Sequence, residues 1–273
     1  MNTSNNHPEL IEKLTEGIAN LTSSDKWQSY LEFQSKFHTY SFNNVLLIAS
    51  QAHDETRVAG FNAWKKFGRN VRKGQKAIFI LAPMICKVAD DNISDEKIQV
   101  LKGFKFVPVF EVLQTDGQDL PSICDRLTGD DPTNCYEHLV KVANSLGFSV
   151  EDHTFTGSTN GDCSFDLHCI RVEVTNTPAQ RVKTLAHELA HAILHTDKSN
   201  RSLTELEAES VAYIVCQVLV IESSDYSLGY VTTWAGGDQA IASIKASCER
   251  IQRAVSGILQ SSVMSQAKHY NVA

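Results

Sequence analysis

The segment that most constrains this chain is the run His-Glu-Leu-Ala-His at residues 187–191. On a helix, residues four apart lie on the same face, so His187 and His191 can bind one metal ion. Glu188 then stands where it can activate a water molecule beside a Zn²⁺ ion. Because buried histidine and glutamate side chains need a strong partner, we expect a buried helix with Zn²⁺ as cofactor. The flanking residues that indicate burial are Val182, Leu185, Leu189, Ala190, Ile193 and Leu194.

The third metal ligand is expected from the next helix. A catalytic zinc ion takes three protein ligands and keeps a further position for water. Glu205 and Glu209 share a helix face, whereas Glu207 points away. We expect Glu205 as the ligand and Glu209 as the acid that orients a histidine, with Glu209 as the rival ligand. The alternative roles are helix caps, of Glu205 with Ser202 and of Glu207 with Thr204, and the second pair fits a cap better.

Two further side chains extend the predicted centre. His195 continues the histidine face by another turn, and we expect it to orient a ligand or cap the helix rather than bind the ion. Tyr213, two turns after Glu205, could donate to an oxyanion, although a core tyrosine is the commoner case. Glu188 would take the proton of the water and pass it to the leaving amine of a peptide.

Periodicity predicts a mixed α+β chain. Apolar residues at helical spacing predict a helix through Leu10–Leu21 and, after a cap at Ser23 or Ser24, a second through Trp27–Phe37. Further helices are expected near 43–48, 134–146, 178–196, 203–222 and 238–260. Strands are expected at 77–82, 84–89, 104–112, 148–154 and 168–175.

Turn-forming residues between 114 and 134 indicate a linker between two domains. We expect a small α+β domain at 1–115, a linker at 116–134 and an α+β domain at 135–273.

Basic residues gather in one part of an otherwise acidic chain. The whole chain has a net charge of −7, yet Thr56–Lys87 contains eight basic residues and no acid, so the remainder carries −15. Aromatic residues that could stack on bases lie nearby: Tyr40, Phe42, Phe61, Trp64 and Phe67. Such a mixture is typical of single-stranded nucleic acid binding. The alternative is a solvated turn whose aromatic residues belong to the core.

The candidate DNA-binding residues are Tyr40, Asn44, Trp64, Lys65, Arg69, Arg72, Lys73 and Lys76. The basic ones have no acidic partner nearby in sequence, which favours contacts with phosphates. No helix-turn-helix, zinc-finger or ribonucleoprotein motif is evident, so reading of duplex sequence is not indicated.

Composition indicates a cytoplasmic protein without a membrane segment. No apolar run reaches the roughly 18–20 residues that a membrane helix needs. The polar N-terminus does not have the pattern of a signal peptide. The seven cysteines are scattered and form no Cys-x-x-Cys pair, which is typical of reduced thiols.

Several motifs in a fixed order resemble the ArdC-type antirestriction family of plasmids and other mobile elements. In the N-terminal half they are residues 37–51, 58–64, 68–69, 71–74, 80–83 and 108–115. In the C-terminal half they are residues 180–191 and 205–213. The resemblance extends over about residues 25–260. It departs from the family pattern at Glu111 and Leu113, and residues 116–170 match only loosely.

This resemblance implies an N-terminal single-stranded-DNA-binding domain and a C-terminal metallopeptidase-like domain, similar to zincins of the ImmA/IrrE and SprT groups. In zincins with a glutamate ligand, the pattern Glu-x-x-Ala-acid carries that ligand on its first residue, which here is Glu205, followed by Ala208 and Glu209. The implied function is protection of incoming DNA from restriction by a DNA-binding protein with a zinc peptidase domain. The alternatives are a DNA-targeted endopeptidase that cleaves a repressor or a DNA-bound protein, and a non-catalytic DNA-binding module with structural zinc.

Overall fold

The computed structural model describes residues 8–21, 23–52, 57–89, 97–118, 132–195, 200–221 and 238–263. The helices of the N-terminal half are α1 (Pro8–Asn20), α2 (Ser24–Lys36), α3 (Phe42–Ala49), α4 (Phe61–Lys66) and the 3₁₀ turn η1 (Val112–Gln114). Those of the C-terminal half are α5 (Pro132–Ser145), α6 (Pro178–Leu194), α7 (Arg201–Val218) and α8 (Asp238–Val263). The strands are β1 (Val58–Gly60), β2 (Arg69–Val71), β3 (Ile78–Ala89), β4 (Lys97–Glu111), β5 (Thr115–Gly117), β6 (Ser149–His153), β7 (Gly161–Ser164) and β8 (Cys169–Glu173).

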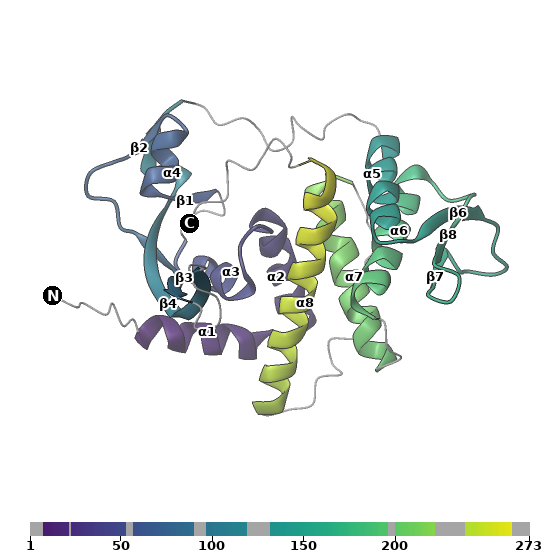
Figure 1. Cartoon of the computed structure of the whole chain (residues 1–273), viewed down its shortest axis with the longest axis horizontal. Coiled ribbons are helices and arrows are strands. Elements are labelled where there is room, and N and C mark those ends of the chain that lie inside the picture. Colours follow the sequence, from purple (N-terminus) through teal and green to yellow (C-terminus); the bar gives the residue numbers. More distant parts are fainter. Residues whose placement is uncertain are drawn as a thin grey trace. The chain divides into compact units, whose positions relative to one another are not determined.

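The elements form two compact units, and the predicted α+β class is confirmed (Figure 1). One unit comprises the chain up to Gly17 together with Asn43–Asp119, and the other comprises Ile18–Phe42 together with Leu120–Tyr270. In the second unit, the indole of Trp27 on α2 is fully buried and donates a 3.1 Å hydrogen bond to Ser210 on α7. The division expected from the sequence, 1–115 and 135–273, assigns α2 to the other half. As a statement about independently folding domains it stays a prediction, and residues 119–131 of its linker lie outside the described residues.

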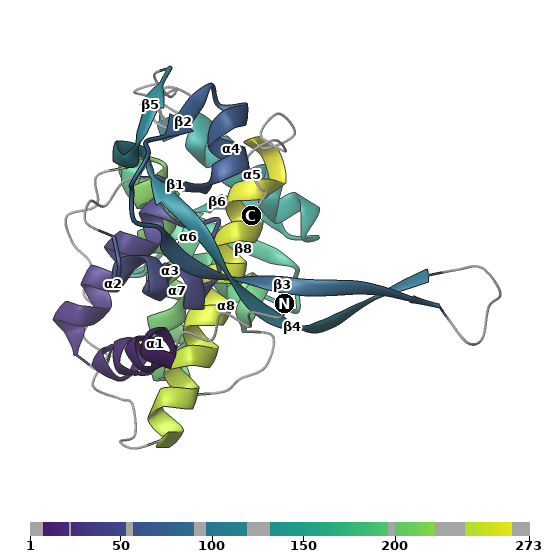
Figure 2. The ribbon, with the colours of Figure 1, turned by 90° about the vertical axis from the view of Figure 1, so that its left-hand side faces the viewer.

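The first unit is built on an antiparallel sheet in the order β1–β4–β3. Beyond the short β1, strands β3 and β4 continue as a two-stranded arm (Figure 2). The two strands expected at 77–82 and 84–89 are one strand whose register shifts between Met84 and Ile85. Pro83 does not interrupt it, because β3 is an edge strand and a proline there removes no ladder hydrogen bond.

Two amide side chains, one on α3 and one just after its end, cover part of the edge of β3. Asn44 accepts a 2.8 Å hydrogen bond from the N–H of Leu81 and donates a 2.9 Å bond to its carbonyl. Gln51 accepts from the N–H of Phe79 at 3.0 Å and donates to its carbonyl at 2.9 Å. In an antiparallel pair, the backbone N–H and C=O groups of every second residue point away from the partner strand. Phe79 and Leu81 point away from β4 in this way, and the two amides bind the groups that would otherwise stay unpaired. Asn44 therefore acts as a structural clamp at this edge, and its expected role in contacting DNA stays a prediction.

The second unit contains a three-stranded sheet in the order β6–β8–β7, with β6 parallel and β7 antiparallel to β8. Helix α6 packs against β7, β8 and α5, and it also contacts α7, which packs in turn on α8 (Figure 1). The apolar face of α6 is fully buried. Strand β7 was not expected from the sequence, because four residues are too few to display a period of two.

The clamp gives a direct test of the first unit. Asn44→Ala leaves the two backbone groups of Leu81 without their partner, so we expect a loss of about 1–3 kcal/mol in the free energy of unfolding. The midpoint of urea denaturation measures this loss. Asn62→Ala, at an exposed position on α4, is the control and is expected to change the midpoint little. A normal midpoint in Asn44→Ala combined with weaker DNA binding would return this residue to the DNA interface.

Candidate metal centre

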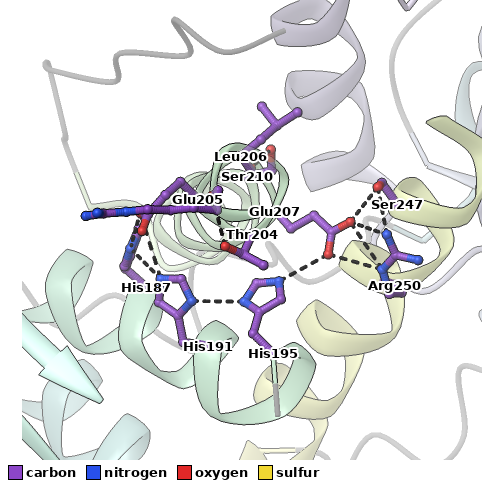
Figure 3. Close-up of polar contacts among 11 residues, drawn as sticks. His187, His191, His195, Thr204, Glu205, Leu206, Glu207, Ser210, Ser247 and Arg250 are labelled. Atoms are coloured by element: carbon purple, nitrogen blue, oxygen red, sulfur yellow. Dashed lines mark hydrogen bonds and ion pairs between the residues drawn. The ribbon is translucent and has the colours of Figure 1, made fainter. Parts of the chain in front are cut away.

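Helix α6 presents its two motif histidines on a partly exposed face. The helix begins after Thr177, whose side chain accepts a hydrogen bond from the backbone of Gln180, and Pro178 occupies the first turn, where no N–H partner is needed. Its buried side, which includes Leu185 and Leu189, fixes the rotation of the helix in the unit. The histidines, four residues apart, therefore project together toward α7 (Figure 3).

Three side chains bring potential ligand atoms together. The Nε2 atoms of His187 and His191 are 3.1 Å apart. Oε2 of Glu205 lies 3.5 Å from the first and 3.9 Å from the second. Two imidazole nitrogens and one carboxylate oxygen, all within 4.8 Å of one another, form a donor set that zinc prefers. At zinc–nitrogen distances of about 2.0–2.1 Å, tetrahedral ligands stand roughly 3.3 Å apart, so the arrangement fits one ion.

Glu209 lies behind His187 rather than beside Glu205. Its Oε2 is 3.2 Å from Nδ1 of His187, and its Oε1 is 3.1 Å from Nζ of Lys183. This is the position in which an acid orients a histidine whose other nitrogen faces a metal. Burial alone would lower the pKa of His187, but hydrogen bonds to Glu205 and Glu209 raise it to about 9. Surroundings that favour a proton on this imidazole also favour a metal cation.

Glu188 lies on the buried side of α6, where it faces β7. Burial raises the pKa of its carboxyl group to about 7, helped by the charges of Asp162 and Glu205 and opposed by that of His187. The backbone of β7 comes so close that a Cβ atom at Gly161 would lie 3.3 Å from Cγ of Glu188 and 2.5 Å from Cγ2 of Thr184. Only a glycine permits this approach. Sequence reasoning missed Gly161, and the signal that could have found it is its place in an Asn-Gly-Asp turn sequence.

The structure corrects the capping roles considered for α7. The helix begins at Arg201, and its cap is Asn200, whose side chain accepts from the N–H of Ser202. Glu207 is instead buried, with 1% of its surface exposed. Burial acts to raise the pKa of its carboxyl group, but hydrogen bonds with His195, Arg250 and Ser247 hold the pKa below its usual value. Glu207 therefore remains charged inside the unit.

The remaining two side chains near the centre have structural partners. His195 is the C-cap residue of α6, and its Nδ1 lies 2.9 Å from Nδ1 of His191. It stands outside the group of three ligand atoms, as its expected role in orienting a ligand requires. The hydroxyl of Tyr213 lies 3.4 Å from Oε1 of Glu32 on α2, and the side chain is buried. These contacts favour the core alternative for Tyr213 over an oxyanion role.

Two aromatic candidates for DNA stacking are differently placed. Trp64 is 1% exposed, and its Nε1 donates a 2.9 Å hydrogen bond to the carbonyl of Phe110, which holds α4 on β4. This burial favours the alternative in which Trp64 belongs to the core, because a buried ring offers no face to a base; its stacking role stays a prediction. Tyr40 belongs to the second unit, where the centre of its ring lies 6.2 Å from the centre of the Phe37 ring. Burial raises the pKa of its hydroxyl to about 12.

The arginine candidates brace the ribbon of β2 and β5 in the first unit. Arg69 donates to the hydroxyl and carbonyl of Thr115 at 2.7 and 3.0 Å, and also to the carbonyls of Gly117 and Gln118. Arg72 forms a 3.1 Å ion pair with Asp116 and donates to the carbonyl of Leu113. The absence of acidic partners nearby in sequence was therefore misleading, because Asp116 lies 44 residues away.

The lysine candidates Lys65, Lys73 and Lys76 are exposed, as is Lys66. Phe61 at the start of α4 is 45% exposed, and Nζ of Lys65 lies 4.8 Å from the centre of its ring. Basic charge and an accessible aromatic face therefore occur side by side on α4.

The fold and the centre together define an α+β protein whose C-terminal half resembles a glutamate-zincin. A family model described as the N-terminal domain of the anti-restriction factor ArdC matches residues 5–112, and one described as an IrrE N-terminal-like domain matches residues 139–216. The chain therefore contains an N-terminal domain similar to that of ArdC, followed by an IrrE-like domain. The resemblance drawn from the sequence motifs is confirmed.

Individual proteins similar to this chain are 17–25% identical to it in sequence. An uncharacterized protein of Bacillus anthracis, pXO2-81, is 25% identical over 295 aligned positions, which cover 92% of this chain. This chain spans about half the length of that relative, 50%. The antirestriction protein ArdC of plasmid R388, solved in metal-free form, is 20% identical with a TM-score of 0.49, covering 81% of this chain and 84% of its own. Its Mn(II)-bound form is 17% identical with a TM-score of 0.45, covering 89% and 99%.

The ligand set can be tested by metal analysis. We expect one equivalent of zinc per chain, and we expect His187→Ala to abolish stoichiometric binding, because a site with two ligands cannot hold the ion firmly. Glu205→Ala should weaken binding far more than Glu209→Gln, which preserves the shape of a residue that only orients His187. Metal content after dialysis measures all three variants. A full equivalent of zinc in His187→Ala, or a stronger loss in Glu209→Gln than in Glu205→Ala, would contradict this assignment.

Proposed function

We propose that this chain is an antirestriction-type protein that binds single-stranded DNA through its N-terminal domain and carries a zinc-dependent peptidase domain in its C-terminal half. The observation that carries the proposal is the convergence of His187, His191 and Glu205 beside the buried carboxyl group of Glu188. A site that served only to hold the fold together would have no use for a buried acid next to its ligands.

His187, His191 and Glu205 would hold the ion in the proposed peptidase. When bound, zinc would polarise a peptide carbonyl and lower the pKa of a water molecule. Glu188 acts as the general base and then as the acid that protonates the leaving amine. Burial of this carboxyl group raises its pKa and so makes its carboxylate a stronger base than an exposed one.

We infer that a peptide substrate would bind along one edge of the second sheet. Strand β7 lies at the edge of the order β6–β8–β7, and Gly161 brings its backbone against Glu188. An extended peptide can add to a sheet edge through main-chain hydrogen bonds, which recognise its backbone rather than its sequence. The proposed substrate is therefore an extended segment of protein lying along β7.

The DNA-binding part of the proposal rests on exposed charge and one exposed ring. The exposed side chains of Lys65, Lys73 and Lys76 can neutralise phosphates. Arg69 and Arg72 instead hold the ribbon of β2 and β5 in place. Phe61 can stack on a base. Among the described residues no helix is long and apolar enough to span a membrane.

The peptidase proposal predicts a separation of metal binding from catalysis. Glu188→Gln keeps the volume of the side chain and removes its ability to accept a proton. We expect the variant to bind a full equivalent of zinc, to melt near the wild-type temperature, and to lose at least about a hundredfold in peptide cleavage. Cleavage of unstructured protein substrates, followed by mass spectrometry, provides the measurement. Unchanged cleavage in Glu188→Gln would reject this residue as the general base.

The DNA proposal predicts a change in salt dependence. Each phosphate contact on a single strand contributes about 0.7 to the slope of log affinity against log salt. Replacing Lys73 and Lys76 together by Ala should therefore flatten this slope by about 1.4, with little dependence on DNA sequence. Fluorescence anisotropy with single-stranded oligonucleotides at several salt concentrations measures the slope. Lys245→Ala is the control, because this side chain is 45% exposed on α8, and equal slopes in wild type and both variants would place the DNA site elsewhere.

A further inference from the structure

The two candidate histidine ligands are oriented by different devices. His187 bonds directly to a carboxylate, since its Nδ1 lies 3.2 Å from Oε2 of Glu209. Nδ1 of His191 instead meets another imidazole, with Nδ1 of His195 at 2.9 Å. Figure 3 shows the line of contacts that starts there and leads from α6 to α8.

The geometry determines where the protons lie along this line. For His191 to offer the lone pair of Nε2 to a metal, its proton must sit on Nδ1. A nitrogen–nitrogen hydrogen bond needs one donor and one acceptor, so Nδ1 of His195 accepts and its proton sits on Nε2. That Nε2 lies 3.2 Å from Oε2 of Glu207, which accepts it. The hydrogen bonds from His191 to His195 and from His195 to Glu207 therefore both point away from the metal ligand.

The acceptor at the end of the line is held by α8. Nε of Arg250 lies 3.1 Å from each carboxylate oxygen of Glu207, and its Nη2 donates a further hydrogen bond to Oε1. The hydroxyl of Ser247 donates to the same oxygen. A carboxylate bound by a guanidinium group in two places cannot swing away from its position, so it gives His195 a fixed partner.

We propose that His195, Glu207 and Arg250 form a relay of hydrogen bonds that orients His191 for metal binding. The three are positioning residues and do not bind the ion themselves. The relay links a ligand on α6 through α7 to α8, so the affinity of the site for zinc depends on how α8 packs. This inference rests on the proposed metal site, and it assigns a function to a buried charged cluster outside the ligand group.

A pair of variants at one position tests the relay. His195→Asn places an amide oxygen near the position of Nδ1, where it can still accept from His191. His195→Leu introduces a side chain with nearly the shape of asparagine but without a hydrogen-bond acceptor. Neither side chain reaches Glu207 as histidine does, so both variants lose that contact equally. We expect the Leu variant to bind zinc about 10–100-fold more weakly than wild type, and the Asn variant to recover a large part of this loss.

The measurement is zinc affinity of the full chain, obtained by competition with a chromophoric chelator, beside the melting temperature of each apoprotein. Gln252→Ala is the control on α8, because Gln252 bonds to Ser256 on its own helix. We expect its zinc affinity to match wild type. Equal zinc affinity in wild type, Asn and Leu variants would overturn the relay while leaving the metal site intact. A wild-type protein that binds no zinc would instead reject the proposed function, and the relay with it.

A second readout does not depend on the stability of any variant. Nitrogen NMR of the wild-type histidines, recorded with and without zinc, reports which ring nitrogen carries the proton. We expect the proton on Nδ1 in His191 and on Nε2 in His195, with His195 unchanged in its coordination when zinc is added. A proton on Nδ1 of His195, or zinc coordination by this residue, would overturn the relay even if both His195 variants failed to fold.

Discussion

The burial of the Glu207 carboxylate determines how α7 is rotated in the second unit. A residue two positions away on a helix lies about 200° around the axis, so turning Glu207 toward α8 turns Glu205 and Glu209 toward α6. Arg250, Ser247 and His195 supply the contacts that keep this charge inside. Removing one partner of a buried ion pair costs about 3–5 kcal/mol, so other rotations of the helix are strongly disfavoured. The convergence at the candidate metal centre depends on this single orientation.

The sequence predicted the long helices and the pairing of the two histidines on one helix face well, because both depend on local spacing. The apolar period of α6 continues over 17 residues, and its histidines are four apart. The role of Glu207 could not be obtained in this way, since its partner Arg250 is 43 residues distant. Strands of three or four residues, such as β1 and β7, were missed for a different reason: they are too short to show alternation.

The basic segment shows how one kind of residue can serve two purposes. Its composition predicted a surface for an anionic partner, and that reasoning treats every cation alike. The structure separates them, because Arg69 and Arg72 form several hydrogen bonds to the ribbon while the lysines extend into solvent. Guanidinium groups suit fixed, many-bonded positions, and ammonium groups suit mobile contacts with phosphates. Trp64 likewise has a structural role, because its ring is buried in the core of the first unit.

The amide clamps on β3 have a consequence for strand alignment. Asn44 and Gln51 recognise only backbone groups, so the side chains of Phe79 and Leu81 can be exchanged for others without loss of these bonds. If β3 slipped by one residue, the backbone groups that now pair with β4 would point toward α3. Both amides would then lose their partners together. Helix α3 and the turn that follows it thus act together as a template that selects one alignment of the hairpin. Mutations on the outer face of β3 should consequently alter its surface chemistry without shifting its pairing.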